Sequence, residues 1–162
     1  MSKKSNFIVP LIGTGIILAA LAVILTSLFM PRRMARKEYN ARLRTLREAQ
    51  TVGYVSVVDP TDQNDVFGRQ DAEARVTDGE TAQKYAARLV EILTGARYGG
   101  EEDALSGNWD IRVRFDIDGE TVDFYLRETD VYISRGSARF VYIPQDTAAY
   151  TALRDELTAL LP

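Results

Sequence analysis

The sequence predicts an α+β fold, with one N-terminal transmembrane helix and a basic stalk helix before a small domain in which two helices pack on one face of an antiparallel sheet. Three observations lead to this prediction. Residues 7–30 carry no charge, residues 109–127 alternate between apolar and polar side chains, and residues 77–95 and 145–161 carry apolar residues at helical spacing. We therefore divide the chain into a tail (1–6), a transmembrane helix (7–30), a basic juxtamembrane stalk helix (31–51) and an acidic α+β domain (52–162).

The uncharged stretch at 7–30 is rich in Leu, Ile, Val and Ala. As a helix it is roughly 36 Å long, which is enough to cross a bilayer core of about 30 Å with some tilt. A buried helix and a cleaved signal peptide are the alternatives, but the run is long for a signal peptide, and residues 28–31 offer no small-x-small cleavage site. The chain has no Cys, which excludes an anchoring lipidated cysteine. We interpret 7–30 as an uncleaved single span.

The next segment is strongly basic, with seven Lys or Arg against two Glu over residues 29–50. Tyr39, Leu43 and Leu46 follow at spacings of four and three, which predicts a helix with a thin apolar stripe. This helix continues the span as a stalk, pairs with a partner helix, or lies on anionic headgroups. The cations nearest the span are predicted to lie at the membrane interface: Arg32, Arg33, Arg36 and Lys37. Their excess over the N-terminal side places the domain in the cytosol.

Charge is unevenly distributed along the chain. The net charge is −3, but residues 1–50 carry nine Lys or Arg against two acids, and residues 51–162 carry eleven against twenty-one. An acidic domain repels phosphates, so we expect no nucleic-acid partner. The absence of His and Cys removes the commonest general base, thiolate chemistry and the commonest metal ligands. We therefore expect no metal and no cofactor.

The acidic domain begins with a strand at 51–59, ended by Pro60, and a short strand follows at 74–76. Thr77 and Glu80 have the spacing of a capping box, which predicts a helix start, and Gly95 is placed to end that helix. The segment 96–108 is predicted to be a loop.

A hairpin over 109–127 is the clearest local pattern. Asp118 and Gly119 form the pair that a two-residue type I′ turn requires, since both positions need a positive φ. This turn sets the register, and the predicted cross-strand pairs are Ile117–Glu120, Phe115–Val122, Val113–Phe124, Ile111–Leu126, Arg114–Asp123 and Asp110–Arg127. All apolar partners then lie on one face, and opposite charges meet on the other.

Two further strands, 131–134 and 138–143, precede Pro144 and a last helix. The predicted buried stripe of that helix is Tyr150, Leu153, Leu157, Leu160 and Leu161. Four consecutive antiparallel strands between two helices predict a sheet with both helices on one face.

The outer face of the hairpin carries an unusual mixture of side chains. The residues that project there are Arg112, Arg114, Tyr125 and Arg127, with Tyr132 beside them. Arg and Tyr are enriched at recognition surfaces, so this face is a candidate partner-binding surface. The alternative is an ordinary solvated face with paired charges.

Residues 52–161 share four features with other proteins: "VTDGE" before a helix, the hairpin at "DIDGE", and the strands "VYIS" and "FVYIP". This part of the chain resembles the small YhfM-like domains of membrane-anchored proteins and lipoproteins of Gram-positive bacteria. The resemblance implies a bacterial protein with a surface-exposed domain of uncharacterised function, and it carries no catalytic residues. It places the domain outside the cytoplasm, opposite to the side that the charge bias predicts.

Together these observations predict a single-pass cell-membrane protein whose acidic domain is a non-catalytic binding or regulatory module for a protein partner. Two alternatives stay open. One is a small membrane-anchored hydrolase that uses carboxylates, which requires two of them in a cleft with pKa values pushed apart. The other is a structural subunit of a membrane complex.

Overall fold

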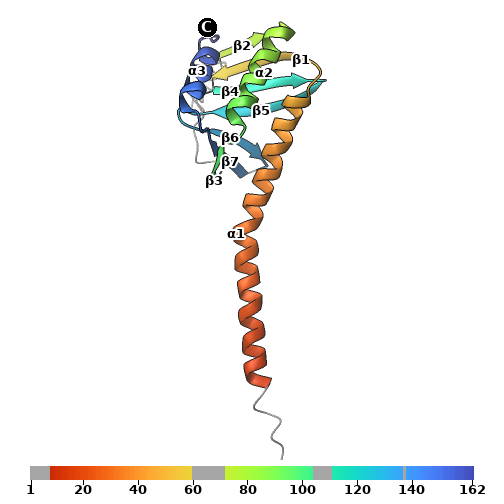
Figure 1. The fold of residues 1–162 in the computed structure, drawn as a ribbon, viewed down its shortest axis with the longest axis vertical. Coiled ribbons are helices and arrows are strands. Elements are labelled where there is room, and N and C mark those ends of the chain that lie inside the picture. Colours follow the sequence, from red (N-terminus) through yellow and green to blue (C-terminus); the bar gives the residue numbers. More distant parts are fainter. Residues whose placement is uncertain (1–7, 60–71, 104–110, 137) are drawn as a thin grey trace, which may run out of the picture. The chain divides into compact units, whose positions relative to one another are not determined.

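A seven-stranded antiparallel sheet with the strand order β2-β1-β4-β5-β6-β7-β3 is the centre of the fold (Figure 1). The computed structural model describes residues 8–59, 72–103, 111–136 and 138–162. The strands are β1 (Val52–Asp59), β2 (Ala72–Val76), β3 (Arg97–Asp103), β4 (Ile111–Ile117), β5 (Glu120–Leu126), β6 (Val131–Arg135) and β7 (Ala138–Ile143).

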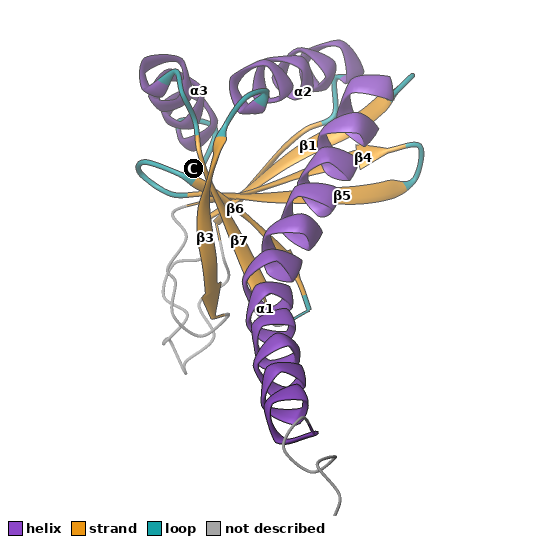
Figure 2. Ribbon diagram, turned by 60° about the horizontal axis from the view of Figure 1, so that its bottom comes forward, coloured by secondary structure: helices purple, strands orange, loops and turns teal. Residues whose placement is uncertain are grey.

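The helices are α1 (Ile8–Glu48), α2 (Gly79–Leu93) and α3 (Thr147–Thr158). Contacts divide the chain into two units, 1–35 and 36–162, so the C-terminal end of α1 belongs with the sheet. Figure 2 shows α2 and α3 over the same face of the sheet. Between them and the sheet lies the core, whose largest buried side chains include Phe115, Phe124, Leu89, Leu93, Ile111, Leu126, Ile133, Tyr150, Leu153 and Leu157.

The predicted transmembrane helix at 7–30 is not supported by the structure. Among the described ranges, no helix has the length and apolar character needed to cross a membrane. The side chains that the structure describes in this stretch are those of residues 16–26, 29 and 30. The large apolar side chains among them are exposed. The fold class that we predicted, with its membrane-spanning helix, is therefore wrong, and residues 1–7 lie outside the described part.

The basic segment is a helix, as predicted, but its C-terminal end is part of the folded unit. Tyr39, Leu43 and Leu46 are buried. Tyr39 stacks on Tyr142 of β7 with the ring centroids 3.7 Å apart, and its hydroxyl donates to the Leu93 carbonyl oxygen at the end of α2. Burial, and then the neighbouring Tyr142, raise the pKa of Tyr39, so its hydroxyl stays protonated and keeps donating. These buried side chains and the Tyr39 hydrogen bond join this end of α1 to the domain.

The predicted hairpin is confirmed. Asp118 and Gly119 have φ values of +52° and +86°, as a type I′ turn requires. The register is the expected one from Ile117–Glu120 to Ile111–Leu126 and includes Arg114–Asp123. The sixth predicted pair cannot be assessed because Asp110 lies outside the described residues.

Strand β3 was predicted to be a loop. Residues 97–103 contain two glycines and three acids and show no apolar alternation, yet they pair with β7 along its full length. The register shifts between Tyr98 and Gly100, and Gly100 has a φ of +148°, a conformation that a side chain disfavours. Strand β3 lies at the edge of the sheet, beside β7. Its extended conformation therefore comes from pairing with β7 and not from the strand propensity of its own residues.

Both helices α2 and α3 have aspartate caps. The cap of α2 is Asp78 and not the predicted Thr77. A capping side chain accepts from the backbone N–H three residues further along the chain, and the Asp78 carboxylate accepts from that of Thr81. Asp146 caps α3 in the same way. Helix α3 ends at Thr158, so the predicted Leu160 and Leu161 follow it and are only half-buried.

Candidate functional site

The sheet has an opening between β5 and β6. In the described part of the chain these strands pair at only two positions, Tyr125–Tyr132 and Leu126–Val131. Beyond them, the guanidinium of Arg42 from α1 links the strands. It donates to the Asp123 carbonyl oxygen at 2.5 Å and to the Ser134 carbonyl oxygen at 2.6 Å. Arg42 therefore takes the place of the missing strand pairing and fixes the width of the opening.

A cavity of about 300 Å³ lies at this opening. Two carboxylates, one guanidinium and three hydroxyl groups line it, contributed by Glu38, Arg42, Thr121, Val122, Asp123, Tyr125 and Ser134. Its volume is at the lower end of the range for small-ligand sites, which run from about 300 to 1,000 Å³. Thus α1, β5 and β6 together build a polar cavity.

The two carboxylates of the cavity are held in different ways. Asp123 accepts from Arg114 through both oxygens, at 2.7 and 2.8 Å. This hydrogen bonding raises the pKa of Arg114 and fixes the pair. Glu38 accepts from Arg42 through Oε1 at 3.2 Å, and its Oε2 lies 4.0 Å from Nε of Arg135. Among the described residues, no hydrogen bond reaches Oε2, so Glu38 is the carboxylate whose oxygen is available to a substrate or a water.

Arg135 completes this arrangement at the end of β6. Its side chain is 51% exposed, and the part of the chain that the structure describes offers it no partner other than Glu38. A carboxylate oxygen and a half-exposed guanidinium therefore lie 4.0 Å apart. The carboxylate oxygen can accept a hydrogen bond, and the guanidinium can stabilise negative charge.

The structure also brings together the predicted partner-binding residues, of which Tyr125 lines the cavity as well. Arg112 faces Tyr125 across the hairpin, and the ring of Tyr125 stacks on that of Tyr132 with the centroids 4.6 Å apart. Tyr132, however, is buried, and burial is the main cause of its raised pKa. The guanidinium groups of Arg127 and Arg139 lie 5.5 and 5.0 Å from the centroid of its ring. Tyr132 is thus part of a packed cluster, and partner binding by this face stays a prediction.

Arg127 is engaged within the domain. It makes ion pairs with Glu102 at 2.9 Å and Asp130 at 2.6 Å. Its predicted partner Asp110 lies outside the described residues. The predicted membrane-interface residues, Arg32, Arg33, Arg36 and Lys37, are exposed on α1, and the structure gives them no membrane role.

Sequence reasoning did not identify Glu38, Arg42, Arg135 or Ser134 as site residues. The spacing of Glu38 and Arg42 is that of an i,i+4 ion pair, which is a detectable signal for a helix but not for a site. Nothing in the sequence distinguishes Arg42 from the other six cations around it.

Comparisons with known proteins add little. No family model matches the chain, and no curated protein matches it. A solved structure described as a thioesterase-like protein from Clostridium sporogenes is 13% identical, covers 68% of this chain and 96% of its own, and superposes with a TM-score of 0.38. A likeness this weak assigns no activity, and the resemblance to YhfM-like domains stays a prediction.

These findings correct several predictions about location and function. The cell-membrane location and the single-pass topology depended on the span at 7–30, which the described residues do not provide. The interpretation of the domain as a non-catalytic binding or regulatory module loses the membrane setting on which it depended. We retain neither that interpretation nor the expectation that the chain is not an enzyme.

Proposed function

We propose that the domain is a carboxylate-dependent hydrolase that cleaves small carboxylic esters at the cavity between β5 and β6. A single observation carries the proposal: Glu38 is fixed through Oε1 by Arg42, while Oε2 is turned toward the half-exposed Arg135. In a chain without His or Cys, a carboxylate is a candidate general base for ester hydrolysis.

The reaction assigns one role to each of these groups. Glu38 takes a proton from a water molecule as the water oxygen attacks the ester carbonyl carbon. The carbonyl oxygen becomes an oxyanion, which Arg135 stabilises. When the carbon–oxygen bond of the alcohol breaks, the leaving oxygen takes the proton back from Glu38. The products are a carboxylic acid and an alcohol, and Glu38 is again ionised.

The other residues hold Glu38 in place. Arg42 donates to Glu38 and to both strands, so it couples the position of the base to the width of the opening. Tyr39 directly follows Glu38 in α1. It anchors the helix through its stacking on Tyr142 and its hydrogen bond to the Leu93 carbonyl oxygen. These are positioning roles, because no reacting atom touches these groups.

The test is ester hydrolysis by the full-length chain, with p-nitrophenyl acetate and p-nitrophenyl butyrate as probes. Glu38→Gln keeps the oxygen that accepts from Arg42 but removes the base, so we expect kcat/KM to fall by about 100-fold. Arg135→Met is expected to lower kcat by about 10-fold, since an exposed oxyanion donor contributes less than a buried one. Glu80→Gln is the matched control, because Glu80 is exposed and pairs with Lys84 on α2.

Two results would contradict the proposal. One is the absence of hydrolysis of either ester by the wild-type chain. The other is a Glu38→Gln variant that retains its rate within about twofold while the melting temperature is unchanged, because general-base catalysis contributes far more than this.

A further inference from the structure

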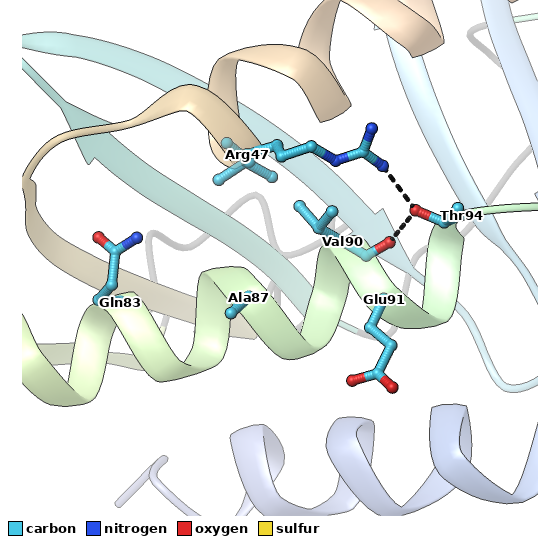
Figure 3. Close-up of a pocket in the computed structure, with 7 residues that line it drawn as sticks. Arg47, Gln83, Ala87, Val90, Glu91 and Thr94 are labelled. Atoms are coloured by element: carbon cyan, nitrogen blue, oxygen red, sulfur yellow. Dashed lines mark hydrogen bonds between the residues drawn. The ribbon is translucent and has the colours of Figure 1, made fainter.

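A second cavity, of about 400 Å³, lies in the groove between the C-terminal end of α1 and α2 (Figure 3). It does not share a residue with the cavity at the β5–β6 opening. The residues that line it are Leu46, Arg47, Gln83, Ala87, Val90, Glu91 and Thr94. Leu46 and Val90 are buried and give the groove an apolar floor, and the remaining side chains form a largely polar rim.

Arg47 is placed at the rim by a chain of two hydrogen bonds. The Thr94 hydroxyl donates to the Val90 carbonyl oxygen at 2.6 Å and accepts from Nη2 of Arg47 at 3.0 Å. Figure 3 shows this chain closing one end of the groove, with Gln83 toward the other end. Only one guanidinium nitrogen is used, so the other donors of Arg47 remain for a ligand.

No carboxylate within the described ranges pairs with Arg47. The nearest acid of the groove is Glu91, and Figure 3 shows its side chain pointing away from the guanidinium. The groove thus combines an apolar floor, one cation without a counter-ion, and one acid at a distance. A ligand with an apolar body and a single negative charge complements this arrangement.

We propose that this groove is a binding site for a small aliphatic monocarboxylate. The carboxylate pairs with Arg47, and the hydrocarbon lies over Leu46, Ala87 and Val90. Glu91 favours a monoanion over a dianion, because a second negative charge in the groove adds repulsion. The site is independent of the proposed hydrolase activity.

The test is hexanoate binding to the full-length chain by isothermal titration calorimetry, with hexanol and hexyl phosphate as comparison probes. We expect hexanoate to bind at least 10-fold more tightly than either. Arg47→Gln is expected to weaken hexanoate binding at least 10-fold, and Arg44→Gln, the same charge change on an exposed residue of the same helix, is expected to leave it unchanged. Glu91→Gln is expected to tighten hexanoate binding and to narrow the difference from hexyl phosphate.

A second variant guards against an effect on folding. Ala87 is exposed, so Ala87→Phe is compatible with the fold while its ring fills the groove, and we expect it to abolish hexanoate binding without lowering the melting temperature. Equal affinity for hexanol and hexanoate, or hexanoate affinity that is the same in Arg47→Gln and the wild type, would overturn the proposal. Tighter binding of hexyl phosphate than of hexanoate would overturn the choice of a monocarboxylate.

Discussion

Substitution of Arg42 should lower the stability of the domain, because this one side chain replaces part of the pairing between β5 and β6. Arg42→Met keeps an apolar stem of similar length and removes the hydrogen bonds to the Asp123 and Ser134 carbonyl oxygens and to Glu38. A hydrogen bond from a charged donor contributes about 1.5–3 kcal/mol. The Arg42 side chain is 19% exposed, so water replaces part of what is lost.

We therefore expect Arg42→Met to lower the free energy of unfolding by about 2–3 kcal/mol, less than the sum of its bonds. Arg42→Lys is expected to lose about half as much, because an ammonium group keeps the charge but lacks the planar fork that reaches two carbonyls. The measurement is urea unfolding followed by circular dichroism. Hydrogen exchange of the β5 and β6 amides, compared with those of β4, shows whether the loss is local.

Arg44→Met is the control, since Arg44 is exposed one half-turn along the same helix. Its effect should stay within about 0.5 kcal/mol, as for ordinary surface substitutions. If Arg42→Met also stays within that range, the guanidinium does not hold the strands together. Other interactions would then set the spacing of β5 and β6 at the opening.

Two further predictions concern ion pairs and hydrogen bonds of the sheet. A double-mutant cycle that exchanges Arg114→Asp and Asp123→Arg should show a coupling of about 0.5–1.5 kcal/mol, because the pair is bidentate and partly buried; additive effects would argue against it. The Ser56 hydroxyl donates to Glu73 at 2.7 Å and lowers the pKa of Glu73 below its ordinary 4.5. The fold thus favours the ionised form of Glu73. The contribution of Glu73 to the free energy of unfolding is fully present above its ordinary pKa, and it is lost as the pH falls through the lowered pKa. The stability difference between the wild type and Glu73→Gln should shrink from about pH 6 to about pH 3, and a difference that is constant with pH would contradict this.

The sequence by itself determined the features that depend on neighbours along the chain. Asp118 and Gly119 fixed the hairpin turn, and the alternation on either side of them fixed its register, because a two-residue turn leaves the strands one way to pair. The buried stripe of α2, which includes Tyr85, Leu89 and Leu93, was visible for the same reason: helical spacing repeats within a few residues.

Only the tertiary structure decided the features that depend on distant residues. Strand β3 exists because β7 offers it hydrogen bonds, and its own residues show no strand pattern. Arg42 reaches carbonyl oxygens 81 and 92 residues away, and Tyr39 reaches one 54 residues away. In the sequence, Arg42 is one of seven Lys or Arg residues between positions 29 and 50. A charge has the same local pattern whether it is solvated or bridges two strands, so only the folded chain shows which arginine builds the site.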